Sequence, residues 1–173
     1  MSADPAAAVR VVEPGREVAR WLLLWLALLA GPTAAGEIVG KVVKVHDGDT
    51  VTVLVGRQQV RIRLNDIDAP ERKQAFGTRS RQSLGELCDA KIARVLEQGK
   101  DRYGRTLGRL LCGGVDVNAE QVRRGMAWVF ERYAPKNSPL YTLQTEARAA
   151  RRGLWTDPRP VAPWEWRAFQ RKQ

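Results

Sequence analysis

Residues 39–55 read VGKVVKVHDGDTVTVLV, a stretch rich in valine on both sides of Asp47-Gly48. Beyond that pair, every second residue from Val51 to Val55 is a valine. An Asp-Gly pair between two such runs is typical of the tight turn in a β-hairpin. The stretch therefore predicts two antiparallel strands, and support of the turn is the simplest role for Asp47.

The rest of the chain predicts further short elements. A third strand is expected at Val60–Leu64, where apolar side chains share one face while Arg61 and Arg63 share the other. Apolar spacing then predicts a helix at 74–90, strands at Ile92–Leu96 and Leu107–Cys112, a helix from Val117 to Gly125 and a last helix from Leu140 to Arg152. Five short strands with helices mainly in the second half indicate an α+β fold, built on a small closed Greek-key β-barrel with about three helices.

At 173 residues, 44% of them hydrophobic, the chain is long enough for one modest core and too short for two ordinary domains. We expect that domain at residues 36–157. The tail, residues 158–173, combines Trp164 and Trp166 with basic side chains, and we expect it to be an extended or partly disordered appendage.

The first 35 residues have the pattern of a secretory signal peptide. The apolar run Trp21–Ala30 follows two arginines, and the small residues Thr33-Ala34-Ala35 suit cleavage ahead of Gly36. The run has about ten residues, whereas a membrane-spanning helix needs roughly 20, so a membrane anchor is the weaker interpretation. We therefore expect an exported protein, periplasmic or secreted, that is a monomer without a stable membrane span.

Export affects the interpretation of the two cysteines, Cys88 and Cys112. In an oxidising compartment they can form a disulfide that closes a loop and stabilises the fold by roughly 3 kcal/mol. The alternative is two ordinary buried thiols. Together with His46 they are too few for a structural zinc site.

The formal net charge of +10 favours a polyanionic partner, because neutralisation of phosphates by Lys and Arg releases condensed counterions. The alternative is a basic surface that serves only solubility.

Three short segments carry the chemically informative residues: 47–50 (DGDT), 63–71 (RLNDIDAPE) and 101–105 (DRYGR). Among their side chains are three carboxylates, Asp49, Asp68 and Glu71, and two arginines, Arg63 and Arg105. These are the groups needed to hold a hard divalent cation and to cleave a phosphodiester beside it. Taken singly, each of these acids would be an ordinary turn or surface residue and each arginine a surface cation.

In order, spacing and chemistry the three segments resemble the staphylococcal nuclease (thermonuclease) homologues. The resemblance extends from about Val39 to Trp155 and includes a helix with Val117-Asn118 and Gly125 at matching positions, and the closing Gly153-Leu154-Trp155. It implies that the predicted barrel is the OB-fold of that family.

The resemblance implies that Asp49 and Asp68 are carboxylate ligands of Ca²⁺, with the backbone carbonyl of Ala69 as a further ligand. Calcium takes six to eight oxygen ligands, so waters and a substrate phosphate would complete the set. Alanine in place of the family's frequent threonine costs nothing if the carbonyl is the ligand. Asp66 departs from the family, and it either supports the site from behind or faces solvent.

By the same resemblance, Glu71 is the candidate general base that orients or deprotonates the attacking water. Arg63 and Arg105 would bind the phosphate oxygens and stabilise the charge of the transition state, because a guanidinium offers bidentate geometry. His46 is interpreted as a neighbour of the site and not as a catalytic group.

Arg102, Tyr103 and Tyr133 are the candidate substrate-binding residues. The first two match family positions that contact a terminal phosphate of a nucleotide, while the surroundings of Tyr133 depart from the family, which leaves core packing as the alternative for it. Aromatic stacking beside basic side chains would favour unpaired strands over duplex.

The sequence therefore predicts an exported Ca²⁺-dependent nuclease that hydrolyses DNA, and RNA as well, with little sequence specificity and leaves 3′-phosphate products. One alternative is a non-catalytic OB-fold module that binds nucleic acid without cutting it. Another is an envelope protein whose basic surface binds anionic lipid or polymer.

Overall fold

The computed structural model describes residues 36–172. The expected signal peptide, residues 1–35, and its cleavage ahead of Gly36 lie outside the described residues. Within the described range, no helix is both long enough and apolar enough to cross a membrane.

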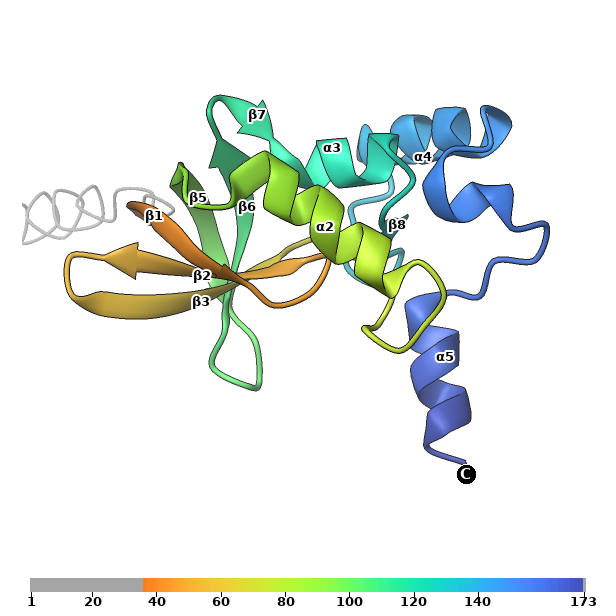
Figure 1. The fold of residues 1–173 in the computed structure, drawn as a ribbon, viewed down its shortest axis with the longest axis horizontal. Coiled ribbons are helices and arrows are strands. Elements are labelled where there is room, and N and C mark those ends of the chain that lie inside the picture. Colours follow the sequence, from red (N-terminus) through yellow and green to blue (C-terminus); the bar gives the residue numbers. More distant parts are fainter. Residues whose placement is uncertain (1–35, 173) are drawn as a thin grey trace, which may run out of the picture. The chain divides into compact units, whose positions relative to one another are not determined.

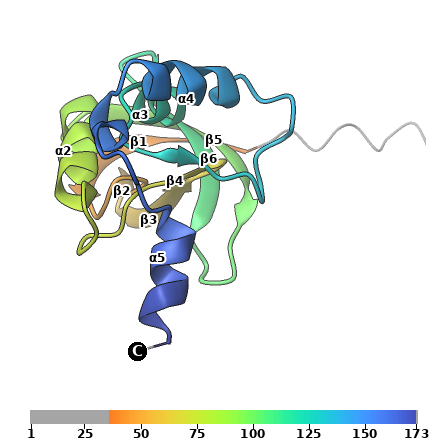
Figure 2. The same ribbon diagram turned by 90° about the vertical axis from the view of Figure 1, so that its right-hand side faces the viewer.

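Five strands form a closed β-barrel, as Figures 1 and 2 show. The strands are β1 (Glu37–Val45), β2 (Thr50–Val55), β3 (Gln58–Leu64), β5 (Ile92–Lys100) and β6 (Thr106–Cys112). They pair in the order β3-β2-β1-β5-β6, and a parallel pairing of β3 with β6 closes the barrel. This confirms the fold class expected from the sequence.

The hairpin expected at residues 39–55 is present. Strands β1 and β2 pair antiparallel and are joined by residues 46–49, where the backbone N–H of His46 donates to the carbonyl of Thr50 at 2.9 Å. Alternation along the strands sends one set of side chains inward. The fully buried set from the first three strands comprises Val42, Val51, Val53, Ile62 and Leu64.

Four α-helices follow within the described residues: α2 (Gly77–Cys88), α3 (Val117–Arg123), α4 (Leu140–Ala149) and α5 (Pro163–Gln170). Helix α3 packs against both α2 and α4. A 3₁₀ turn, η2, spans Gly153–Thr156, and β7 (Val115–Asp116) extends the sheet beyond β6. A small second sheet pairs β4 (Ile67–Asp68) with β8 (Trp128–Val129), which positions the residues that follow β3.

The expectation of an extended or partly disordered tail is wrong for Pro163–Gln170, which form α5. A helix this short depends on tertiary packing for its stability. Its Trp164 ring stacks on Phe130 with centroids 5.4 Å apart and meets the edge of Trp128 at 5.7 Å. Pro163 stands at the first helical position, where its missing N–H costs nothing. In Figures 1 and 2, α5 extends away from the barrel.

In the structure, Cys88 and Cys112 form a disulfide with Cα atoms 5.5 Å apart. Cys88 is the last residue of α2 and Cys112 the last of β6, and both side chains are buried. The bond therefore ties the first helix of the described chain to the barrel.

Candidate active site

A cleft of about 790 Å³ lies where the β1–β2 turn, the segment after β3, the 101–105 loop and α5 meet. Every residue to which the sequence assigns a catalytic, metal-binding or substrate-binding role lines this cleft: Asp49, Arg63, Asp68, Ala69, Glu71, Arg102, Tyr103, Arg105 and Tyr133. The structure thus brings together residues separated by up to about 80 positions in the sequence.

Arg63 joins the two buried acids. Its Nε lies 3.1 Å from Asp49 Oδ1 and its Nη2 lies 2.9 Å from Asp68 Oδ1. Its Nη1 donates to the backbone carbonyls of Leu64, at 2.5 Å, and Ile67, at 2.9 Å. All three nitrogens of the guanidinium therefore contact protein groups. In this structure Arg63 holds the carboxylates of Asp49 and Asp68 at a fixed separation.

Asp49 is fixed by the turn that carries it. One carboxylate oxygen accepts from the hydroxyl of Thr50 at 3.0 Å, and the other accepts from the backbone N–H of Ala69 at 2.7 Å. The turn itself is anchored from behind, since Gln121 Nε2 donates to the carbonyl of Gly48 at 2.7 Å. Asp49 is only 5% exposed, so its orientation is set by the fold.

Negative charge is concentrated at the turn. Burial, with the adjacent charge of Asp49, raises the pKa of Asp47 to about 7, although its Oδ1 accepts from the Asp49 backbone N–H at 3.0 Å. Burial also raises the pKa of Asp68, and hydrogen bonds from Arg167 oppose that shift. Asp47 therefore supports the turn, as expected, and adds an acid that lacks a counterion of its own among the described residues.

Glu71 stands just beyond β4 on the wall of the cleft, with 41% of its side chain exposed. Its backbone N–H donates to Gln74 Oε1 at 3.1 Å. Its Oε1 accepts from Nη1 of Arg167 at 2.7 Å. A half-exposed carboxylate at this place can reach both water in the cleft and the neighbouring acids.

Arg105 also lines the cleft and is oriented by Asp101. Its Nε lies 2.7 Å from Asp101 Oδ2, while Asp101 Oδ1 accepts the backbone N–H groups of Tyr103, at 2.9 Å, and Arg105, at 3.0 Å. Partial burial opposes ionisation of Asp101, but these hydrogen bonds outweigh it and hold the pKa of Asp101 below its usual range. Among the described residues, Asp101 is the sole acid paired with Arg105, and Arg105 lines the cleft.

The candidate substrate-binding residues present exposed aromatic rings. Tyr103 is 68% exposed and Tyr133 is 64% exposed, so core packing, the alternative for Tyr133, is wrong. The Arg102 guanidinium lies 4.8 Å from the Tyr103 ring centroid, and the Tyr133 ring meets the edge of Phe130 at 4.9 Å. Such ring and guanidinium faces can stack on bases.

The remaining polar residues near the site have local partners. Asp66 has a positive φ of 63°, its side chain accepts from Asn65 Nδ2 at 2.6 Å, and its backbone carbonyl accepts from the Phe130 N–H. It is half-buried in the turn before β4 and touches neither Asp49 nor Asp68 through a hydrogen bond. His46 Nε2 lies 2.8 Å from the Thr52 hydroxyl, outside the cleft, and burial together with nearby cations lowers its pKa.

Two cleft residues were missed by sequence reasoning. Asp101 was part of a quoted motif but had no assigned role, and its spacing of four from Arg105 is the only signal for the ion pair. Arg167 lies in the tail that was expected to be disordered, and no local pattern signals its contacts with acids nearly 100 residues earlier.

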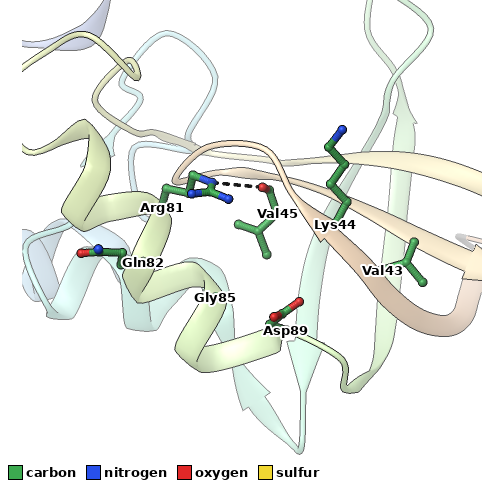
Figure 3. A pocket seen from close by; sticks show the side chains of 7 residues that line it. All are labelled: Val43, Lys44, Val45, Arg81, Gln82, Gly85 and Asp89. Carbon is green, nitrogen blue, oxygen red and sulfur yellow. Dashed lines mark hydrogen bonds between the residues drawn. The ribbon is translucent and has the colours of Figure 1, made fainter.

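A second hollow, of about 350 Å³, lies between β1 and α2 (Figure 3). There Arg81 Nε donates to the carbonyl of Val45 at 3.2 Å, and Asp89 is the only acid in the lining. It brings no two carboxylates together, so the candidate chemistry belongs to the larger cleft.

A closed five-stranded barrel of this kind defines the class of OB-fold proteins, and a cleft that pairs buried acids with arginines has groups able to bind cations and phosphate. The sequence profile described as "Staphylococcal nuclease homologue" matches residues 61–157, more than half of the chain. The chain belongs to the family of staphylococcal nuclease homologues.

Individual relatives agree with the family match. The chain is 44% identical over 152 residues to a protein of Shigella flexneri named "Micrococcal nuclease", covering 82% of this chain and 87% of that one. It is 44% identical over 149 residues to an "Uncharacterized endonuclease" of Escherichia coli O157:H7, covering 86% and 97%. It is also 38% identical over 114 residues to "Staphylococcal-like nuclease CAN1" of Arabidopsis thaliana, covering 66% and 35%. Together these relatives support a nuclease activity.

Proposed function

We propose that this protein is a Ca²⁺-dependent nuclease that hydrolyses phosphodiester bonds in DNA and RNA with little sequence specificity. One observation carries the proposal. Arg63 holds Asp49 and Asp68 together at the floor of a cleft, while Glu71 and Arg105 stand on its walls. That arrangement combines acids that can bind a cation and activate water with an arginine that can bind phosphate.

The donor set fits a hard cation. Among the described residues, no group of three or more His, Cys, Asp or Glu side chains is arranged to hold a metal ion. Asp49 and Asp68 nevertheless offer carboxylate oxygens from two segments that line the same cleft. Calcium accepts such a site when a backbone carbonyl, here that of Ala69, waters and a substrate phosphate supply further oxygens.

Bound there, Ca²⁺ would supply positive charge beside the phosphate oxygens. The protein's own residues would do the rest. Glu71 would take a proton from a water as that water's oxygen bonds to phosphorus, and the bond from phosphorus to the 5′ oxygen would break. The 5′ oxygen would take a proton from solvent water as it leaves, so the products are a 3′-phosphate and a 5′-hydroxyl. Arg105 lines the cleft and would stabilise the charge that develops on the phosphate.

The exposed rings and cations near the cleft mouth favour single-stranded substrate. Tyr103 and Tyr133 can stack on any base, since every base has a π-face, and Arg102 lies beside the first of them. Duplex bases are already stacked on each other and cannot use these rings without unpairing.

Digestion of heat-denatured DNA by the purified protein, with Ca²⁺ or with a chelator, tests the proposal. We expect Ca²⁺-dependent cutting that Glu71→Gln and Arg105→Ala each reduce by about 10²- to 10⁴-fold. Exposed residues outside the cleft provide matched controls, namely Glu146→Gln on α4 and Arg57→Ala between β2 and β3. A folded protein that binds the DNA but leaves it intact with every divalent metal tried would instead be a non-catalytic binding module.

We also propose that the nuclease is exported, on the basis of the apolar run and small residues in positions 1–35. The intact mass of protein expressed with its own N-terminus tests this. A species beginning at Gly36 outside the cytoplasm is expected, and full-length protein confined to the cytoplasm would contradict it.

A further inference from the structure

Arg167 of α5 reaches into the acidic side of the cleft. Its Nη1 lies 2.7 Å from Glu71 Oε1 and 3.2 Å from Asp68 Oδ1, and its Nη2 lies 2.6 Å from Asp68 Oδ2. One guanidinium therefore spans a proposed cation ligand and the proposed general base. No other basic side chain of the described tail makes an ion pair with these acids.

These contacts use the same oxygen lone pairs that a cation would need. A carboxylate offers about four acceptor sites on its two oxygens. On Asp68, Oδ1 receives donors from both Arg63 and Arg167, and Oδ2 receives a second donor from Arg167. Asp68 is 2% exposed, so water does not offer it an alternative partner. Little coordinating capacity remains while Arg167 is in place.

The charge balance leads to the same conclusion. Asp49, Asp68 and Glu71 carry three negative charges when ionised, and Arg63 and Arg167 oppose two of them. Arg167 places a positive charge directly beside Asp68 and Glu71, so a divalent cation that approached the same acids would be repelled by it. With Arg167 withdrawn, the cation and Arg63 together balance the three acids.

Helix α5 is held in a way that permits such a withdrawal. Pro163 is its only buried residue. Its first turn is fixed by Trp164 against Phe130, and just before it the carbonyl of Val161 accepts from Gln74 Nε2 at 2.7 Å. One turn later, the contacts of Arg167 are the only side-chain hydrogen bonds or ion pairs that α5 makes with the described chain beyond its own N-cap residue. The second half of α5 can therefore move without disturbing the core.

We propose that Arg167 and the divalent cation compete for Asp68 and Glu71, so that α5 closes the acidic side of the cleft in the cation-free protein and is released when the cation binds. The inference rests on the proposed function, because it takes these acids as the cation site. It makes α5 an internal inhibitor that is removed by the cofactor.

Calorimetry tests the competition directly, by measuring the binding of Ca²⁺ to the full-length protein in the absence of DNA. Arg167→Gln should tighten Ca²⁺ binding by about tenfold, the scale of a typical coupling between two binding events. Arg171→Gln is the matched control. It removes the same charge from the residue that caps the C-terminal end of α5 and also lines the cleft, without an ion pair to the described residues. This change should alter Ca²⁺ affinity by less than about twofold.

Hydrogen exchange of the peptide covering 163–170 tests the release. In the wild type, Ca²⁺ should speed exchange of these amides several-fold, while a peptide from α2 stays unchanged. In Arg167→Gln the α5 amides should exchange fast with or without Ca²⁺. Far-UV circular dichroism confirms that each variant is folded.

The outcomes separate this inference from the proposed function. Calcium-dependent cutting together with an unchanged or weakened Ca²⁺ affinity in Arg167→Gln would leave the nuclease intact and overturn the competition, since Arg167 would then position the acids for the cation. Absence of Ca²⁺ binding in both the wild type and Arg167→Gln would overturn both proposals. Tighter Ca²⁺ binding in Arg167→Gln, with no such change in Arg171→Gln, supports the competition.

Discussion

At the residue scale, Arg63 compensates two carboxylates that the fold has already buried. Asp49 and Asp68 are 5% and 2% exposed, and both face the same guanidinium. Removal of one partner from a buried ion pair leaves charge without compensation, which costs more than the pair itself contributes. The arginine therefore matters for stability as well as for the proposed chemistry.

Arg63→Ala should accordingly lower the free energy of unfolding by about 3 kcal/mol. Urea denaturation without divalent cation measures this. Arg61→Ala, on the same strand but with an exposed side chain, should change the value by less than about 0.5 kcal/mol. A loss below about 1 kcal/mol in Arg63→Ala would mean that the two acids are neutral in the folded protein, because a neutral acid needs no counterion.

Asp101 gives a pH-dependent prediction. Its pKa is lower in the folded protein than in the unfolded chain, because Arg105 and two backbone N–H groups bind the ionised form. Its contribution to stability is therefore present above about pH 4 and is lost as the pH falls through the lowered folded pKa. The stability gap between the wild type and Asp101→Asn should be constant from pH 7 to 5 and should shrink towards pH 3. Urea denaturation at each pH measures it, and a gap that widens on acidification would contradict the assignment.

At the element scale, the turn between β1 and β2 owes its position to a close approach to α2. A Cβ added to Gly48 would lie 1.8 Å from Ser80 Oγ and 2.7 Å from the Ala69 side chain. The turn carries Asp49, so a shift of the turn that relieves the clash would also displace this acid. Glycine at position 48 is thus a packing requirement of the site.

Gly48→Ala should destabilise the fold by about 2 kcal/mol, the usual cost of overpacking, and should reduce nuclease activity as well. Gly85→Ala is the matched control within α2, because the space around Gly85 is open, and it should raise stability by about 0.5 to 1 kcal/mol. Thermal unfolding of both variants decides the point. Equal effects of the two substitutions on stability would show that Gly48 is packed less tightly against Ser80 and Ala69 than the distances in the structure indicate.

Elements with local signals could be predicted, whereas α5 and the two-residue strands β4, β7 and β8 could not. The Asp-Gly hairpin and the helix from Val117 carry turn and capping residues inside the sequence that forms them, and both are present. Helix α5 has eight residues, too few for an apolar period to stand out, and it depends on Phe130 and Trp128 for its packing. Helix α5 therefore forms because of packing against residues distant in the sequence, which a local pattern does not reveal.

At the scale of the whole molecule, motif order could predict which residues share the cleft, since the closed barrel brings the turn after β1, the end of β3 and the 101–105 loop to one place. Motifs could not predict how those residues pair. The bridging of two acids by Arg63 and the approach of Arg167 depend on side-chain positions that only the assembled molecule fixes. The proposed roles of these residues therefore stay predictions for the enzyme assays.

The disulfide gives a prediction for the molecule as a unit. Cys88 and Cys112 are 24 positions apart, and cross-linking them restricts the unfolded chain much more than the folded one. A double Cys88→Ser, Cys112→Ser variant should be less stable by about 3 kcal/mol. Urea denaturation of the wild type with a reductant should reproduce that loss, whereas reductant should leave the double variant unchanged. Since the bond links α2 to β6 away from the cleft, the variant should keep its activity at temperatures where it is folded. A wild type that is indifferent to reductant would show that the two thiols are unpaired in solution.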